Sequence, residues 1–113
     1  MSDCVFCKIA RGELPTEILL ETDDLVAFND LNPQAPTHIL VIPKKHIASL
    51  DQAKREDRDL LGALLLAVRS LAQREQLSAG YRVVLNIGSQ GGQSVPHLHF
   101  HLLGGRSLQW PPG

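Results

Sequence analysis

The sequence has no apolar stretch that could cross a membrane and no strong excess of charge of either sign. Its longest apolar run, around Leu64 to Val68, is far shorter than the roughly 20 residues that span a bilayer. Eleven basic and 12 acidic side chains leave a formal net charge of -1. Nothing in this balance favours DNA, RNA or an acidic membrane as a partner. We therefore expect a protein that binds neither nucleic acid nor membranes.

The N-terminus also lacks the marks of a secretory signal. Met1-Ser2-Asp3-Cys4 has neither a basic region nor an apolar segment, which predicts a cytoplasmic protein. Thiols stay reduced in the cytoplasm, so the two cysteines, Cys4 and Cys7, are expected to be free thiols or metal ligands rather than a disulfide. At 113 residues, 43% of them hydrophobic, the chain is expected to form one domain over residues 1–113.

The order of apolar and turn-forming segments predicts an α+β fold. A short N-terminal helix ends at Gly12, and a long helix is predicted where leucine and valine recur at three- and four-residue spacing over residues 60–71. Ser49 or Asp51 can accept the free N–H groups at the start of the long helix. Strands are predicted over residues 18–21, 25–28, 37–43, 81–87 and 97–103. This order indicates a mainly antiparallel, five-stranded sheet with one long and one short helix.

The last predicted strand carries a histidine at every second position. These histidines are His97, His99 and His101, and they alternate with Leu98, Phe100 and Leu102. The two-residue period of a strand places the three imidazoles on one face and the apolar side chains on the core face. Packing alone does not demand such a pattern, so a chemical role is favoured over three structural histidines.

Three imidazoles on one surface suit two chemistries. They can converge on zinc with an open coordination position. Alternatively, neighbouring imidazoles disfavour each other's protonation, which leaves a neutral ring to attack phosphorus. The preceding loop favours phosphorus, because Gly91 and Gly92 let backbone N–H groups approach an anion, while Gln93 and Ser94 add uncharged donors. Without the histidines, this loop would be read as a flexible connection.

These motifs resemble the histidine triad family. Residues 97–103 are similar to its His-x-His-x-His-hydrophobic-hydrophobic signature, and the tail from Trp110 to Gly113 resembles the Hint branch of purine nucleoside phosphoramidases. The likeness extends over residues 28–31, 36–38, 41–46 and 91–95. Nucleotidyltransferase relatives have glutamine where this sequence has His101, which the resemblance associates with hydrolysis.

The resemblance implies hydrolysis of purine nucleoside phosphoramidates to a nucleoside monophosphate and an amine, through a nucleotidyl-histidine intermediate. It implies that His99 is the nucleophile, with its other ring nitrogen oriented by a backbone carbonyl. His101 would help to bind phosphate oxygens, and His38 would complete the proton network. Ser94 would contact the departing amine, and His97 is a further catalytic candidate.

The resemblance also implies a nucleotide pocket and a homodimer. Asp30 would bind the ribose hydroxyls, for which loop capping before Asn32 is the alternative, and Phe28 and Leu31 would contact the base. The phosphate site would be lined by Asn86, Gly92, Gln93, Ser94 and Val95, together with His99 and His101. The sheets of two protomers would join, and Trp110 would either shape the leaving-group preference or anchor the tail.

Two thiols and two imidazoles form a separate candidate metal site. A tetrahedral structural zinc ion would suit the four residues Cys4, Cys7, His46 and His97. Some members of the histidine triad family resemble this pattern. The alternative is that Cys4 and Cys7 are two ordinary thiols. In this interpretation catalysis needs no cofactor. Two other functions remain open, a zinc hydrolase that uses the three histidines as ligands and a nucleotide-binding regulator. The sequence indicates neither the physiological leaving group nor a preference between adenine and guanine.

Overall fold

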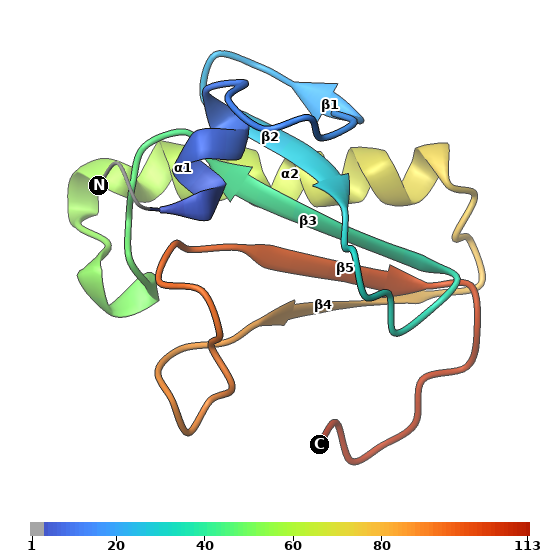
Figure 1. Ribbon diagram of the computed structural model, residues 1–113. Coiled ribbons are helices and arrows are strands. Elements are labelled where there is room, and N and C mark those ends of the chain that lie inside the picture. Colours follow the sequence, from blue (N-terminus) through green and yellow to red (C-terminus); the bar gives the residue numbers. More distant parts are fainter. Residues whose placement is uncertain (1–3) are drawn as a thin grey trace.

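The protein folds as one antiparallel sheet with a helix on each face. The computed structural model describes residues 4–113, so the expectation built on Met1 to Asp3 lies outside the described residues. The sheet has five strands in the order β1-β2-β3-β5-β4. In Figure 1 the long helix α2 crosses behind the sheet and the short helix α1 lies in front of it. The predicted α+β class, sheet and helices are confirmed.

Two long connections interrupt the order of the elements, residues 44–57 between β3 and α2 and residues 86–99 between β4 and β5. The helices are α1 (Val5–Ala10) and α2 (Arg58–Arg74), preceded by two 3-10 turns, η1 (Leu50–Gln52) and η2 (Arg55–Asp57). The strands are β1 (Leu20–Glu21), β2 (Leu25–Asn29), β3 (Thr37–Pro43), β4 (Tyr81–Leu85) and β5 (Phe100–Gly104). Between Cys4 and Gly113, no helix is long and apolar enough to cross a membrane.

The central strand β3 is buried on both faces, as its apolar sequence predicts. Ile39 and Val41 pack into the larger core, which lies between the sheet and α2. Leu40 and Ile42 pack into a smaller core on the opposite face, with Phe6 of α1. The sheet therefore separates a structural layer on the α2 side from a second layer that carries the histidines.

The long helix begins later than the sequence suggested. Ser49 caps η1, because its hydroxyl accepts the Asp51 N–H at 3.2 Å, and Ala53 is extended, which interrupts the helical path. The Asp57 side chain accepts the Lys54 N–H at 2.9 Å, and α2 starts directly after it at Arg58. The expectation that Ser49 or Asp51 caps the long helix is therefore wrong.

The last strand also starts later than predicted. Pairing of β5 with β3 and β4 begins at Phe100, not at His97. The preceding backbone bonds to loops instead, with His97 N–H donating to the Val95 carbonyl at 2.8 Å and Leu98 N–H to the Ile47 carbonyl at 2.7 Å. Two of the three alternating histidines, His97 and His99, therefore lie just outside the regular ladder.

Candidate active site

Three histidines meet on the sheet face opposite α2. The rings of His99 and His101 lie with centroids 5.0 Å apart, and the His38 Nε2 lies 2.9 Å from the His101 Nδ1. His38 and His101 come from the adjacent strands β3 and β5, two residues apart in register, because His38 pairs with Leu103 and His101 with Leu40. The structure thus brings together His99, His101 and the more distant His38, as the sequence analysis expected.

Hydrogen bonds assign the tautomers of His38 and His101. The His38 Nδ1 accepts the Gln34 N–H at 3.0 Å, so in the neutral ring the proton is on Nε2, which donates to the His101 Nδ1. The remaining proton of neutral His101 is then on its Nε2. Each step follows from the preceding donor, and the series ends with an N–H group on His101 that is available to an anion.

The tautomer of His99 is fixed separately. Its Nδ1 lies 2.7 Å from the His97 carbonyl oxygen, which can only accept, so Nδ1 carries the proton. The Nε2 of the neutral ring therefore keeps its lone pair. A neutral imidazole with a defined lone pair is the state that a histidine nucleophile requires.

Burial keeps the neighbouring rings neutral. Burial lowers the pKa of His101 to about 4, and the nearby His99 and His38 add to this effect against the opposing Asp30 carboxylate. Burial also lowers the pKa of His38, although Asp30, with its Oδ2 3.4 Å from the His38 Nε2, acts in the opposite direction. Near neutral pH, His38 and His101 therefore act through dipoles rather than through charge.

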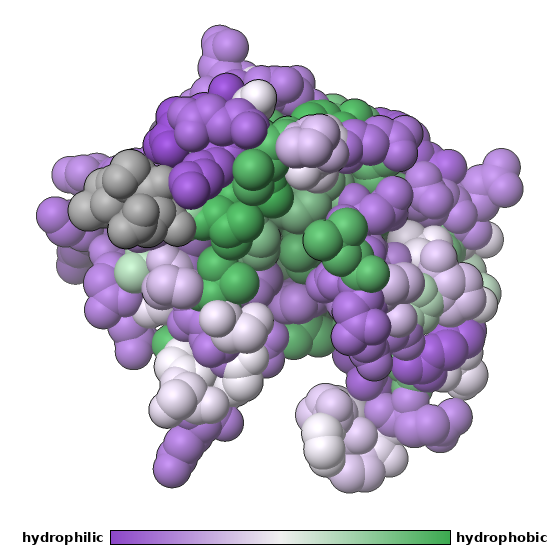
Figure 2. Space-filling model, in the orientation of Figure 1, coloured by the Kyte–Doolittle hydropathy of each residue, from purple (hydrophilic) through white to green (hydrophobic). Residues whose placement is uncertain are grey.

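Two aromatic side chains stand next to one another beside His99. Phe6 of α1 packs edge-to-face on His99, with ring centroids 5.1 Å apart, and on Phe28 at 5.7 Å. Val95 packs against the same cluster. Figure 2 shows hydrophobic residues emerging between hydrophilic borders on this face of the molecule. The sequence analysis found Phe28 and Val95 but missed Phe6, because a helix of six residues is too short for a periodic pattern to show which side chains are buried.

Asp30 and Leu31 behave differently from one another. The Asp30 Oδ1 accepts the Asn32 N–H at 2.8 Å, which is the predicted loop cap, and its Oδ2 faces His38. The carboxylate therefore serves the loop and borders the histidines at the same time. Leu31 is fully exposed, so it makes no apolar pocket in this chain alone.

The glycine-rich loop before the histidines is closed by its own hydrogen bonds. Gly92 N–H donates to the Ser89 carbonyl and Gln93 N–H to the Gly88 carbonyl. The Gly92 N–H is therefore not free to bind an anion, contrary to the expectation from the sequence. The Asn86 side chain donates to the Gly91 carbonyl at 2.7 Å. The Gln93 side chain donates to the carbonyls of Ala48 and Val95. Asn86 and Gln93 thus shape the loop, which leaves Ser94 exposed.

His97 turns away from the other two triad histidines. Its ring is fully buried, its Nε2 donates to the Pro43 carbonyl at 2.8 Å, and its Nδ1 lies 3.2 Å from the Cys4 Sγ. Because both nitrogens are occupied, His97, His99 and His101 do not converge on one metal ion. The geometry therefore does not support the alternative of a zinc hydrolase built on these three ligands.

Instead, His97 belongs to a Cys2His2 cluster. The cluster comprises Cys4, Cys7, His46 and His97, whose ligand atoms lie within 4.8 Å of one another. The Cys7 Sγ is 3.2 Å from the His46 Nδ1 and 3.5 Å from the His97 Nδ1, and the two Nδ1 atoms are 3.2 Å apart. A tetrahedral zinc ion with Zn–S and Zn–N bonds of the usual length places its ligands about 3.3 to 3.8 Å apart. The donors present fit such an ion.

Burial shifts the pKa values of two members of this cluster in opposite directions. Burial lowers the pKa of His97, partly offset by its bond to the Pro43 carbonyl, so the ring is neutral and its Nδ1 lone pair faces the two sulfurs. Burial, with the contact to Cys4, raises the pKa of the Cys7 thiol. A second group, Asp30, His38 and His101, also has its ligand atoms within 4.8 Å, but its nitrogens are engaged in the bonds described above.

Comparison with known proteins places the chain in a family. The family model described as "Scavenger mRNA decapping enzyme C-term binding" matches residues 3–109. An uncharacterized HIT-like protein of Synechococcus elongatus is 58% identical over 111 residues, which are 98% of this chain and 97% of that protein. The chain belongs to the histidine triad family.

Solved structures agree with this assignment. A HIT family hydrolase from Legionella pneumophila superposes with a TM-score of 0.96 at 53% identity, covering 98% of this chain and all (100%) of that one. A histidine triad protein from Clostridium difficile superposes with a TM-score of 0.93 at 45% identity, covering 96% of each chain. This HIT protein therefore shares the whole fold of both, rather than a fragment of it.

Proposed function

We propose that this HIT protein hydrolyses the P–N bond of purine nucleoside phosphoramidates. The observation that carries the proposal is the fixed tautomer of His99, whose Nδ1–H donates to the His97 carbonyl and leaves the Nε2 lone pair free. The similar protein from Legionella pneumophila is named a hydrolase, which supports a hydrolytic reaction here. The Trp110 to Gly113 tail, which resembles the Hint branch, supports the phosphoramidate substrate.

The reaction would proceed in two steps. The His99 Nε2 attacks phosphorus, a P–N bond forms to the ring, and the bond to the departing amine breaks. The nitrogen of the departing amine takes up one proton from solvent, and the Ser94 hydroxyl in the exposed loop is the proposed contact to it. Water then attacks the same phosphorus, which releases the nucleoside monophosphate and regenerates neutral His99. One proton of the water that attacks in the second step returns to solvent, so no net proton is consumed. The N–H of His101 would donate to a phosphate oxygen in both steps.

Two apolar rings define the proposed base site. Phe6 packs on His99 and Phe28 packs on Phe6, and an apolar wall of this kind accepts a purine face. The Asp30 carboxylate, next to His38, is the proposed partner of the ribose hydroxyls. No charged side chain is assigned to the phosphate, so the site binds it with neutral donors.

Intact-protein mass spectrometry tests the mechanism. Wild type, His99→Ala and His101→Ala are mixed with an adenosine phosphoramidate, quenched without acid, and weighed while amine release is followed. We expect an added AMP mass in wild type, none in His99→Ala, and a fall in turnover of about 10³-fold or more for His99→Ala. His101→Ala keeps the nucleophile and should still form the adduct, more slowly. Turnover of His99→Ala at the wild-type rate would refute covalent catalysis at this residue.

A homodimer is part of the proposal. Within residues 4–113, β4 pairs only with β5, so its other edge presents unpaired backbone groups. Tyr81 and Val83 on this strand are 43% and 40% exposed, and Leu65 and Leu66 on α2 are 50% and 61% exposed. A cavity of about 440 Å³ joins the two elements between Arg69 and Tyr81. An open strand edge together with exposed leucines on α2 favours a second copy of the chain as the partner.

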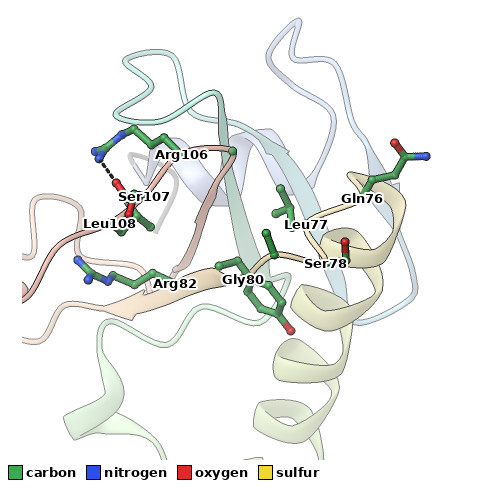
Figure 3. Close-up of a pocket in the computed structure, with 11 residues that line it drawn as sticks. Gln76, Leu77, Ser78, Gly80, Arg82, Arg106, Ser107 and Leu108 are labelled. Atoms are coloured by element: carbon green, nitrogen blue, oxygen red, sulfur yellow. Dashed lines mark hydrogen bonds between the residues drawn. The ribbon is translucent and has the colours of Figure 1, made fainter.

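A second cavity borders the same edge. It has a volume of about 610 Å³ and is lined from the end of α2 to the start of the C-terminal tail. Figure 3 shows Arg82 and the tail residues Arg106, Ser107 and Leu108 on one side, with Gln76, Leu77 and Ser78 on the other. None of its lining residues is a histidine. We interpret it as a hollow beside the proposed dimer edge rather than as the nucleotide site.

The Cys2His2 cluster is the proposed site of a structural zinc ion. The support is the donor set of Cys4, Cys7, His46 and His97, its spacing, and the Pro43 carbonyl that orients the His97 ring. Zinc bound there would supply no reaction step. The proposed chemistry at His99 requires no cofactor.

A further inference from the structure

His97 connects the Cys2His2 cluster to His99, the proposed nucleophile. Its side chain is one of the four cluster ligands, with Nδ1 facing the sulfurs of Cys4 and Cys7. Its backbone carbonyl accepts the Nδ1–H of His99 at 2.7 Å. One residue therefore holds both the metal donor set and the group that selects the tautomer of the proposed nucleophile.

The backbone at His97 has little other support. The ladder of β5 begins only at Phe100, so the carbonyl of His97 is not held by strand pairing. The chain there is fixed by the bonds of His97 N–H to Val95 and of Leu98 N–H to Ile47, both in neighbouring loops. The fully buried side chain of His97, anchored at both nitrogens, is the remaining restraint on the direction of this carbonyl.

A second contact runs through helix α1. Phe6 lies between the two cysteine ligands in sequence and packs edge-to-face on His97 at 5.9 Å and on His99 at 5.1 Å. The helix has only six residues, a length that is not stable alone. Ligation of Cys4 and Cys7 by the same ion as His46 and His97 would tie α1 to the sheet, and with it the ring that packs on the nucleophile.

We propose that the Cys2His2 cluster, when it holds zinc, is a positioning element for catalysis, because it fixes the His97 carbonyl and Phe6 against His99. Zinc occupancy then controls how far His99 is confined to its Nδ1–H tautomer, and hence the rate of phosphorus attack. The cluster has no contact with substrate in this proposal. The inference rests on the proposed nucleophilic role of His99, but its effect on the His99 ring can be observed without turnover.

The test uses two substitutions at one ligand that touches neither His99 nor His101. His46→Asn removes a ligand, whereas His46→Cys replaces one zinc ligand with another. Mass spectrometry of the metal gives the zinc content per chain. Long-range ¹H–¹⁵N NMR gives the tautomer of His99. Hydrolysis of an adenosine phosphoramidate gives kcat and KM. Leu71→Ala removes a buried α2 side chain from the larger core, between the sheet and α2, and controls for a general loss of stability.

We expect one zinc per wild-type chain and a single Nδ1–H tautomer at His99. His46→Asn should lose zinc, show mixed His99 tautomers, and lower kcat about tenfold, the range found when a group supporting a site is removed. A rise in KM would report movement of Phe6 at the proposed base site. His46→Cys should restore zinc, the single tautomer and most of kcat. Leu71→Ala should lower the unfolding temperature and leave the tautomer and kcat unchanged.

Two results would overturn the inference. One is a wild-type chain that binds no zinc. The other is a zinc-free His46→Asn protein that is folded and retains the single His99 tautomer and the wild-type kcat. If His46→Asn does not fold, zinc titration of chelator-treated wild type gives the same NMR readout, and an unchanged tautomer refutes the proposal. An inactive wild type whose His99 tautomer still follows zinc would instead count against the phosphoramidase function alone.

Discussion

Replacing Leu102 with alanine tests whether the two faces of β5 act independently. Leu102 is fully buried in the core beneath α2, whereas its neighbour His101 lies on the opposite face. Truncation of a buried leucine to alanine costs about 3 kcal/mol, up to about 5 where the site cannot collapse. Unfolding of 113 residues carries an entropy of about 0.24 kcal/mol per kelvin. We therefore expect the unfolding temperature to fall by about 12 °C.

Calorimetry at one fixed protein concentration measures this shift, because association would make the unfolding temperature depend on concentration. The kcat/KM for an adenosine phosphoramidate is measured well below both transitions. We expect it to stay within about twofold of wild type, since the histidines lie on the other face of the strand. A folded Leu102→Ala protein with a tenfold lower kcat/KM would refute the separation of the faces, and a shift below about 4 °C would contradict the close packing around Leu102.

Two further predictions concern pH and assembly. Lowering the pH below about 6.5 should destabilise the fold, because the folded pKa of His38 lies below its usual value and that of His101 is about 4. Below pH 6.5 the unfolded chain binds more protons than the folded chain. The contribution of these two histidines to the free energy of unfolding is therefore complete above pH 6.5 and is lost as the pH falls through their folded pKa values. Urea midpoints between pH 4 and 7 measure it, and a His101→Gln protein with the same slope as wild type would contradict the assignment. Val83→Lys at the open edge of β4 should turn a dimer into a monomer in sedimentation analysis, whereas Leu50→Lys, a similarly exposed position on η1, should not; a wild-type monomer would refute the proposed interface.

The two-residue and 3.6-residue periods predicted the layers of the fold but not the side-chain contacts between distant segments. The apolar run Ile39 to Ile42 correctly indicated a strand buried on both faces, and alternation correctly separated Leu102 from His101. The same alternation did not reveal that His97 turns toward Cys4, 93 residues away in the sequence; that grouping was predicted from residue types suited to zinc. Long-range contacts of this kind depend on the docking of α1, about which local periodicity carries no information.

Other differences have equally local causes. The start of α2 was misplaced because Ser49 can cap a 3-10 turn as well as an α-helix, and only the extended Ala53 distinguishes the two. The role of Gln93 was expected to be toward phosphate, yet its amide closes the loop onto Ala48. The tautomers of His38 and His99 required the positions of Gln34 and of the His97 carbonyl, which belong to irregular backbone.

The ordered donors from Gln34 through His38 to His101 give the site a polarity without a formal charge. The N–H groups of this series all point the same way. The Nε2–H of His101 therefore presents the positive end of a row of dipoles, while the rings of His38 and His101 stay neutral. An anion held by such a row is attracted at short range, and the attraction has little of the long reach that salt screens. If the proposed reaction is right, the site would hold a phosphate that is already in place and would release the monophosphate without separating an ion pair.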